Sequence, residues 1–241
     1  MIRLLLSLSI ISFFFHNCTK TEQLPLPISD SIRIGLVAHY PMNGSPRDST
    51  GNNPDLELFN ITTQLSARGN NFGESSYYFA GNTNSFMKLR LNNFRAIRGA
   101  LFISFFAKET GSGTDSPRLF EIWPGNYGAG FYWFNWYQGT IKWAGPDFEL
   151  IADTTVMNRN RWYHLAVLHD IYSIKLYRDG KLIARQNLVG NTPPAAIQLQ
   201  NYMEIGRMAQ VKASAYQGSM LDFRIYNRAL SDREIEYLAN Q

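Results

Sequence analysis

The sequence predicts an all-β fold, a jelly-roll β-sandwich of two antiparallel sheets with a short C-terminal helix. Short β-prone runs recur along most of the 241 residues and are separated by turns rich in Gly, Asn and Asp. The aromatic share of 14% is high and suits a layered core. A helix signal stands out near the end of the chain. Strands at short, even spacing are typical of sandwiches and jelly rolls.

The composition indicates one globular domain with enough apolar material for a core. Hydrophobic residues make up 45% of the chain and charged residues 17%. All-β sandwiches of this length are commonly single domains. The formal net charge is only +4 and no basic run is present, so we do not expect binding to nucleic acid.

The N-terminal segment predicts export. Arg3 precedes an apolar stretch, Leu4 to Phe15, that is too short for an ordinary membrane span. Shortly after it stands Cys18, the only cysteine in the chain. A lone cysteine at this place resembles the bacterial lipoprotein signal, in which the thiol is acylated, although the residues before it are larger than usual. Ordinary cleavage and a retained anchor are the alternatives.

We therefore expect three parts. Residues 1–18 form a lipoprotein-type signal peptide, residues 19–32 a flexible tether broken by Pro25 and Pro27, and residues 33–241 the folded domain. Lipid attachment at Cys18 predicts a protein held on the membrane by that anchor, at the cell outer membrane or the cell surface. Without the anchor, the protein is expected to be secreted or periplasmic.

Several strands can be placed in order. Residues 34–40 (IGLVAHY) form an apolar opening strand. The runs SSYYFAG and SFMKLRL are two short strands around GNTN, a hairpin-type break. Residues 100–109 (ALFISFFAKE) are apolar on both faces, as expected for a strand deep in a layered sandwich.

The second half predicts a paired hairpin and one capped helix. RWYHLAVLHD and SIKLYRDGKLIARQN form a pair of strands, the second folded on a tight turn at Asp179 and Gly180. In LSDREIEYLAN, Ser231 caps a helix and Glu234 reaches back to it. The apolar stripe of this helix consists of Leu230, Ile235 and Leu238.

Three stretches together resemble a known family. They are GLVAHYPMNGSPRDSTGNN, RWYHLAVLHDIYSIKLYRDGKLIA and YQGSMLDFRIYNRALSDREIEYL, with weaker matches in YYFAGNTNSFMKL and LFISFFAK. They are similar to the laminin-G-like jelly-roll domains of the concanavalin A-like lectin/glucanase superfamily, over about Arg33 to Leu238. The resemblance implies a concanavalin A-like jelly roll in which residues 34–40 and 219–226 lie side by side. It implies no single function, since this fold carries lectins, adhesins, hydrolases and inert spacers.

The resemblance also implies a structural Ca²⁺ site between the opening loop and the closing strand. The candidate ligands are Asn43, Asp48 and Asp222, which offer the oxygen atoms that calcium prefers. Leu221 departs from the family pattern, because it replaces the first of two acids in the closing strand. The alternative is that these polar residues only stabilise turns.

An aromatic run, GFYWFNWYQGTIKW at residues 130–143, raises the prospect of a sugar-binding surface. Alternation places Trp133, Asn135 and Tyr137 on one face and Phe134 and Trp136 on the other. One face feeds the core, and the other can present rings about 7 Å apart to successive sugar units. We expect most of the rings in the core and one or two on a concave surface. The candidate ligand-binding residues are Trp123, Tyr127, Trp133, Trp136 and Trp143.

Catalytic patterns are weak, and we expect no enzyme activity. The acids that glycosidases place at alternate strand positions are not matched: Glu121 is followed by Trp123, and Asp147 and Glu149 alternate without continuation. No Gly-x-Ser-x-Gly elbow and no metal-type histidine spacing is present. The expected function is a non-catalytic carbohydrate-binding or adhesion module that meets a glycan or surface glycoconjugate. The alternatives are a structural or protein-binding surface module and, third, a glycoside hydrolase.

Overall fold

The computed structural model describes residues 27–65, 75–92, 99–111, 116–123, 132–145, 148–152, 156–189, 202–209 and 213–241. The predicted signal peptide, with Cys18, lies outside these residues, as does Tyr127. In the part of the chain that is described, no helix has both the length and the apolar character needed to cross a membrane.

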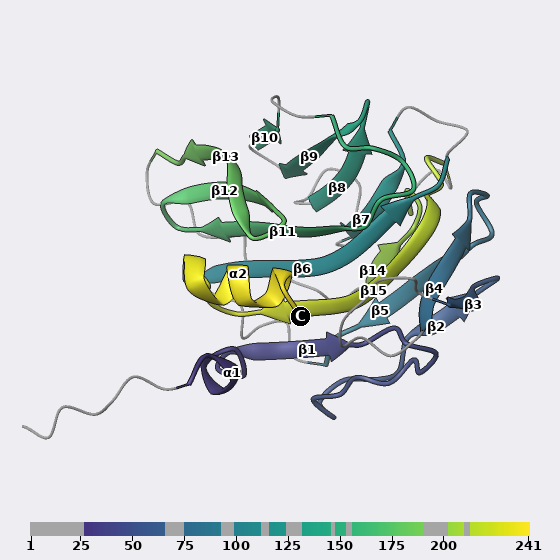
Figure 1. The fold of residues 1–241 in the computed structure, drawn as a ribbon, viewed down its shortest axis with the longest axis horizontal. Coiled ribbons are helices and arrows are strands. Elements are labelled where there is room, and N and C mark those ends of the chain that lie inside the picture. The colour runs from purple at the N-terminus through teal and green to yellow at the C-terminus, as the bar shows by residue number, and fades with distance from the viewer. Residues whose placement is uncertain are drawn as a thin grey trace, which may run out of the picture.

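Two antiparallel sheets pack against each other, which confirms the predicted sandwich (Figure 1). Among the described residues, the eight-stranded sheet has the order β13 (Lys181–Asn187), β12 (Ser173–Arg178), β11 (Tyr163–Asp170), β6 (Ala100–Glu109), β15 (Gln217–Tyr226), β4 (Ser75–Ala80) and β3 (Thr62–Leu65), with β1 (Leu36–Tyr40) also paired to β15. The seven-stranded sheet has the order β10 (Phe148–Ile151), β9 (Thr140–Gly145), β8 (Tyr132–Tyr137), β7 (Arg118–Trp123), β14 (Tyr202–Ile205), β5 (Phe86–Arg90) and β2 (Glu57–Phe59).

Aromatic rings from both sheets fill the space between them. Phe105 of β6 lies 5.9 Å from Phe120 of β7 and 5.8 Å from Phe134 of β8, measured between ring centroids, and both contacts are edge-on. Phe223 of β15 meets Phe120 at 5.9 Å in the same way. These rings are fully buried, and edge-on pairs of this kind add stabilisation beyond the area that they bury.

The opening and closing strands lie side by side, as predicted. Strand β1 pairs antiparallel with β15, with Leu36 opposite Tyr226 and Tyr40 opposite Phe223. Figure 1 shows the same pairing, with the C-terminal end of the chain close to β1. The pairing joins residues almost two hundred positions apart and closes the sandwich.

Strand β6 is apolar on both faces because each face meets a different layer. Leu101, Ile103 and Phe105 belong to the main core between the sheets. Ala100 and Phe102 belong to a second cluster on the other side, where helix α2 (Asp232–Ala239) contributes Ile235 and Leu238, among others. The helix therefore covers one end of the eight-stranded sheet, and the prediction of a deeply buried strand is confirmed.

Local turn and cap chemistry also agrees with the sequence. The hairpin β12–β13 turns at Asp179 and Gly180, with φ of 49° and 78°, the left-handed conformation that Asp-Gly turns favour. At α2, Ser231 Oγ accepts a hydrogen bond from the Glu234 backbone N–H, and the Glu234 carboxylate accepts one from the Ser231 N–H. This capping box confirms the predicted start of the helix.

The predicted hairpin around residues 81–84 is wrong. Strand β4 pairs with β3 and β15 in the eight-stranded sheet, whereas β5 pairs with β2 and β14 in the other sheet. The short turn carries the chain from one layer to the next instead of folding it back on itself. Both strands bury apolar residues, and the alternation pattern does not specify which neighbour a strand takes.

The predicted tether is wrong for its last residues. Helix α1 spans Ile28–Ser31, and the Ser31 hydroxyl donates to the Ile28 carbonyl at 3.0 Å. Ile32 is 8% exposed and packs in the second cluster with residues of the α2 segment. The Arg228 guanidinium also donates to the Ser31 carbonyl at 2.7 Å. The folded part therefore begins before Arg33, because an apolar side chain in this segment finds a buried site.

Candidate functional site

One face of the seven-stranded sheet points away from the core and gathers polar and aromatic side chains. In register, Lys88 of β5 stands opposite Glu204 of β14, and Glu204 stands opposite Glu121 of β7. Their strand neighbours Leu89, Met203 and Ile122 are fully buried in the core. Lys88, Glu204 and Glu121 therefore lie on the opposite side of the sheet, which we call the outer face. Its side chains include Glu57, Phe59, Phe86, Lys88, Arg90, Arg118, Glu121, Asn135, Tyr137, Lys142, Tyr202 and Glu204.

A half-buried tyrosine marks one part of this face. The Lys88 ammonium lies 4.7 Å from the centroid of the Tyr202 ring, and the Arg90 guanidinium carbon lies 5.6 Å from it. Arg90 in turn forms an ion pair with Glu57 at 2.6 Å. Phe59 stands beside the same ammonium, with its ring centroid 5.7 Å from the Lys88 nitrogen. We call Glu57, Phe59, Lys88, Arg90 and Tyr202 the Tyr202 patch.

The Tyr202 patch combines a ring with hydrogen-bonding groups. Burial and the negative charge of Glu204 raise the pKa of the Tyr202 phenol, so the hydroxyl remains a neutral donor at physiological pH. The hydrogen bond that Arg90 donates to the Glu57 carboxylate raises the pKa of Arg90, which keeps its charge. A sugar ring has apolar C–H faces and polar hydroxyls, and this patch offers partners for both.

Behind the patch lies a buried cluster of charges on the same face. Arg118 pairs with Glu121 at 3.2 Å, and Arg207 pairs with Glu204 at 2.7 Å. Both carboxylates are 1% exposed. Burial raises the pKa of Glu121 against the opposing effect of Arg118, and burial lowers the pKa of Arg118 to about 10. Each acid is held by an arginine three residues away on its own segment of chain, so both buried charges are paired locally.

The other acids considered for glycosidase chemistry do not join this cluster. Glu149 lies on β10, is exposed, and pairs with Lys142 at 2.8 Å. Asp147 lies outside the described residues. A glycosidase needs two carboxyl groups that face one scissile bond. In the described part of the chain, Glu121 is committed to a buried ion pair and Glu149 to a surface one.

Two of the five predicted ligand-binding aromatics are core residues. Trp143 is 0% exposed, and its ring centroid lies 5.5 Å from that of Phe120. Trp136 is 3% exposed and meets Tyr163 of the other sheet at 5.8 Å. The prediction that these two rings line a binding surface is therefore corrected. Strand alternation explains their place, since Trp136 shares its face with buried Phe134, and Trp143 stands opposite Phe134.

The strand register places the backbone of Trp123 and of Trp133 opposite residues of the outer face. Trp123 stands opposite Tyr202, and Trp133 stands opposite Glu121. Their side chains and the whole of Tyr127 lie outside the described residues. The sequence reasoning missed Tyr202, although a signal was present: in YMEI, Tyr202 and Glu204 alternate with two apolar residues, which indicates a half-buried strand with a polar face.

Two of the three predicted calcium ligands, Asp48 and Asp222, accept internal hydrogen bonds. The Asp48 carboxylate accepts six of them, at 2.5–3.2 Å, from backbone and side-chain donors of His39, Thr50, Asn52 and Asn53. Burial by itself raises the pKa of Asp48, but these donors outweigh it and lower the pKa. A carboxylate has about four lone-pair directions, so these donors saturate Asp48.

The other two candidate calcium ligands differ in their surroundings. Asp222 accepts hydrogen bonds from His39 Nε2 at 2.7 Å and from Arg224 Nε at 3.0 Å, and Asn43 is exposed. Over the described residues, no group of three or more His, Cys, Asp and Glu side chains is arranged to hold a metal ion.

We therefore expect calcium to leave the stability of the protein unchanged. An ion that binds only the folded state must raise its melting temperature. Thermal unfolding in calcium and in chelator should give the same midpoint, because N–H and O–H donors already occupy the carboxylate oxygens of Asp48. A midpoint several degrees higher in calcium would contradict this expectation and restore the predicted site.

Comparisons with known proteins agree with the architecture. No curated protein sequence matches this one. Among solved structures, domain 4 of the extracellular GH43 arabinanase AbnA from Geobacillus stearothermophilus, in complex with arabinotriose, is similar with a TM-score of 0.63 and 18% identity, over 85% of this chain and 98% of that one. The botulinum neurotoxin serotype D binding domain is similar with a TM-score of 0.67 and 17% identity, over 89% of this chain and 52% of that one.

Another structure of the serotype D ligand-binding domain, in complex with N-acetylneuraminic acid, gives a TM-score of 0.64 and 15% identity, over 89% of this chain and 52% of that one. This chain thus spans about half the length of the neurotoxin domains. At sequence identities this low, the similarity establishes only the fold. The laminin-G-type family model described as the Concanavalin A-like lectin/glucanases superfamily matches residues 82–236, which is more than half of the sequence. The chain therefore belongs to the concanavalin A-like lectin/glucanases superfamily.

Proposed function

We propose that this protein is a carbohydrate-binding or adhesion module that works outside the cell, and that it binds sugars without catalysis on the Tyr202 patch of the outer face. The observation that carries the proposal is the half-buried Tyr202 ring with two cations beside it and the backbone of Trp123 directly opposite. An aromatic face with nearby donors and acceptors suits a ligand that is apolar on its ring faces and polar at its edges.

Two further points support this class of ligand. The arabinanase domain and the neurotoxin domain of similar fold are complexes with arabinotriose and with N-acetylneuraminic acid. The N-terminal segment, with its apolar stretch and Cys18, favours an exported protein that is anchored through a lipid on Cys18. A surface-anchored module of this kind would meet glycans or surface glycoconjugates as its partners.

The decisive variant is Tyr202→Ala. We expect it to weaken glycan binding by about tenfold or more, equivalent to about 1.4 kcal/mol, because the stacking surface is removed while the strand register is kept. A glycan array with plant, host and microbial polysaccharides identifies the ligand, and titration calorimetry then gives the affinities of the wild type and the variant.

Tyr172→Ala is the matched control. Tyr172 is 63% exposed and lies in the turn between β11 and β12 of the other sheet, so its removal should leave binding unchanged. Equal loss in both variants would argue against the Tyr202 patch. Failure of the wild type to bind any glycan on the array would favour the alternative, a structural or protein-binding surface module.

A further inference from the structure

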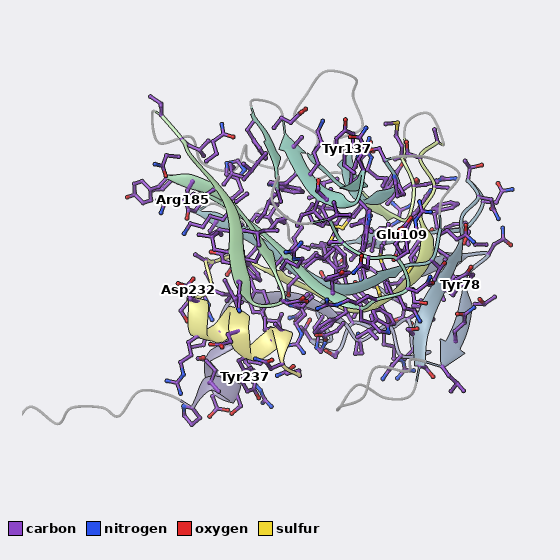
Figure 2. The ribbon with its side chains drawn as sticks, turned by 45° about the horizontal axis from the view of Figure 1, so that its top comes forward. Tyr78, Glu109, Tyr137, Arg185, Asp232 and Tyr237 are labelled. Carbon is purple, nitrogen blue, oxygen red and sulfur yellow. The ribbon has the colours of Figure 1, made fainter. Side chains whose placement is uncertain are left out.

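A second site lies away from the outer face, where the two ends of the folded domain meet. A pocket of about 660 Å³ opens between helices α1 and α2, strand β1 and the loop that follows it. This volume falls in the range of small-molecule sites. Figure 2 shows Tyr237, which lines the pocket, far from Tyr137 of the outer face. No residue of the Tyr202 patch is among those that line the pocket, so the two sites are separate.

Three side chains form a continuous hydrogen-bonded chain at this pocket. Ser49 Oγ lies 2.7 Å from His39 Nδ1, and His39 Nε2 lies 2.7 Å from Asp222 Oδ1. Ser49 is exposed and the His39 side chain is 20% exposed, whereas the Asp222 side chain is 3% exposed. Ser49 and His39 both line the pocket, and Asp222 stands behind them.

The surroundings of Asp222 indicate the direction of the hydrogen bond from His39. Asp222 Oδ1 also accepts a hydrogen bond from Arg224 Nε at 3.0 Å, within an ion pair, so this carboxylate oxygen serves as an acceptor. An ionised carboxylate only accepts, so the proton of a neutral His39 ring sits on Nε2. Nδ1 is then an acceptor, and the Ser49 hydroxyl donates to it. In this arrangement the Asp222 carboxylate orients the His39 ring, and the His39 ring can act as the base that activates the Ser49 hydroxyl.

We propose that Ser49 is a nucleophile for carboxylic esters, with His39 as its base and Asp222 as the residue that positions His39. Ser49 Oγ attacks the ester carbonyl carbon and its proton passes to His39 Nδ1. The tetrahedral intermediate expels the alcohol, which takes that proton, and leaves an acyl group on Ser49. Water, deprotonated by His39, then attacks the acyl-serine carbonyl; the bond to Ser49 Oγ breaks, the proton held by His39 returns to Ser49 Oγ, and a carboxylic acid is released.

The pocket lining fits a small neutral ester. Arg33 and Asn52 line the same pocket, and their side chains carry N–H donors for a carbonyl oxygen that gains negative charge. Ile32, Leu36 and Tyr237 provide apolar wall for the acyl or alcohol part. An ester carried on a surface glycan is one such substrate, although the proposal does not depend on glycan binding at the Tyr202 patch.

A fluorophosphonate probe and p-nitrophenyl acetate test the proposal on the full chain. The probe should label Ser49 of the folded wild type, as identified by peptide mass. Ser49→Ala should lose the label, and its hydrolysis of p-nitrophenyl acetate above the buffer rate should fall by about a hundredfold or more. Ser45→Ala is the matched control, because Ser45 lies in the same loop and its hydroxyl accepts a hydrogen bond from the Arg47 N–H.

Further variants distinguish loss of the reactive site from loss of the folded structure. His39→Gln should lose the label as well, and its thermal unfolding shows whether the protein remains folded. Tyr202→Ala should keep both label and hydrolysis, so the two proposals fail independently. An unlabelled Ser49 in folded wild type, or equal hydrolysis by the wild type and Ser49→Ala, would overturn the proposal and leave the three residues as a joint between β1 and β15.

Discussion

Replacing Trp143 by alanine is expected to lower the free energy of unfolding by about 3–5 kcal/mol. Trp143 is the largest of the fully buried side chains in the described part of the chain. Its ring packs against those of Phe120, Phe134 and Phe148, with centroids 5.5, 6.2 and 6.0 Å away. Removing it loses the transfer free energy of the indole and leaves a cavity between the two sheets. Urea unfolding followed by circular dichroism measures the change.

Tyr172→Ala serves as the reference for this measurement as well. Its exposed ring should contribute less than about 0.5 kcal/mol, as is usual for surface positions. If Trp143→Ala costs no more than Tyr172→Ala, the ring is not part of the core and its place on a binding surface would have to be reconsidered.

Replacing Asp222 by asparagine is expected to destabilise the protein by about 3–5 kcal/mol, as is typical when one partner of a buried ion pair is removed. The variant leaves the buried Arg224 guanidinium without its carboxylate and weakens the link from His39 on β1 to β15. Asp222 has a φ of 56°, a left-handed conformation that asparagine also adopts, so the change isolates the charge. Urea unfolding at neutral pH gives the difference.

The effect of Asp222→Asn should depend on pH in a defined direction. The pKa of Asp222 is lower in the folded protein than the usual value of about 3.9, so its contribution is present above that pH and is lost as the pH falls below it. The exposed pair Arg90–Glu57 gives the control, since Glu57→Gln should change stability by at most about 1 kcal/mol. An equal effect of both substitutions would contradict the assigned importance of the Asp222 ion pair.

The outer face was only partly predictable from the sequence. Alternation in the aromatic run correctly separates Phe134 and Trp136 from Asn135 and Tyr137. It does not say which set faces the core, because both contain large rings. The Tyr202 patch escaped prediction for another reason: its members come from three strands of the seven-stranded sheet, and Tyr202 meets Lys88 and Arg90 only through the pairing of β14 with β5.

The sequence by itself determined the features that depend on near neighbours along the chain. The Asp179–Gly180 turn, the capping box of Ser231 and Glu234, and the doubly apolar strand β6 all follow from residues a few positions apart. The family motifs also predicted that the first and last strands pair, which local patterns alone do not predict.

Only the tertiary structure decided which sheet each strand joins and which distant side chains meet. The chain passes from β4 in one sheet to β5 in the other although the turn between them is short. His39 reaches Asp222 across 183 positions of sequence and also meets Ser49, in a hydrogen-bonded chain that no spacing rule describes. The physical reason is that strand pairing and burial depend on the free energy of the whole core, whereas turns and caps depend on a few adjacent residues.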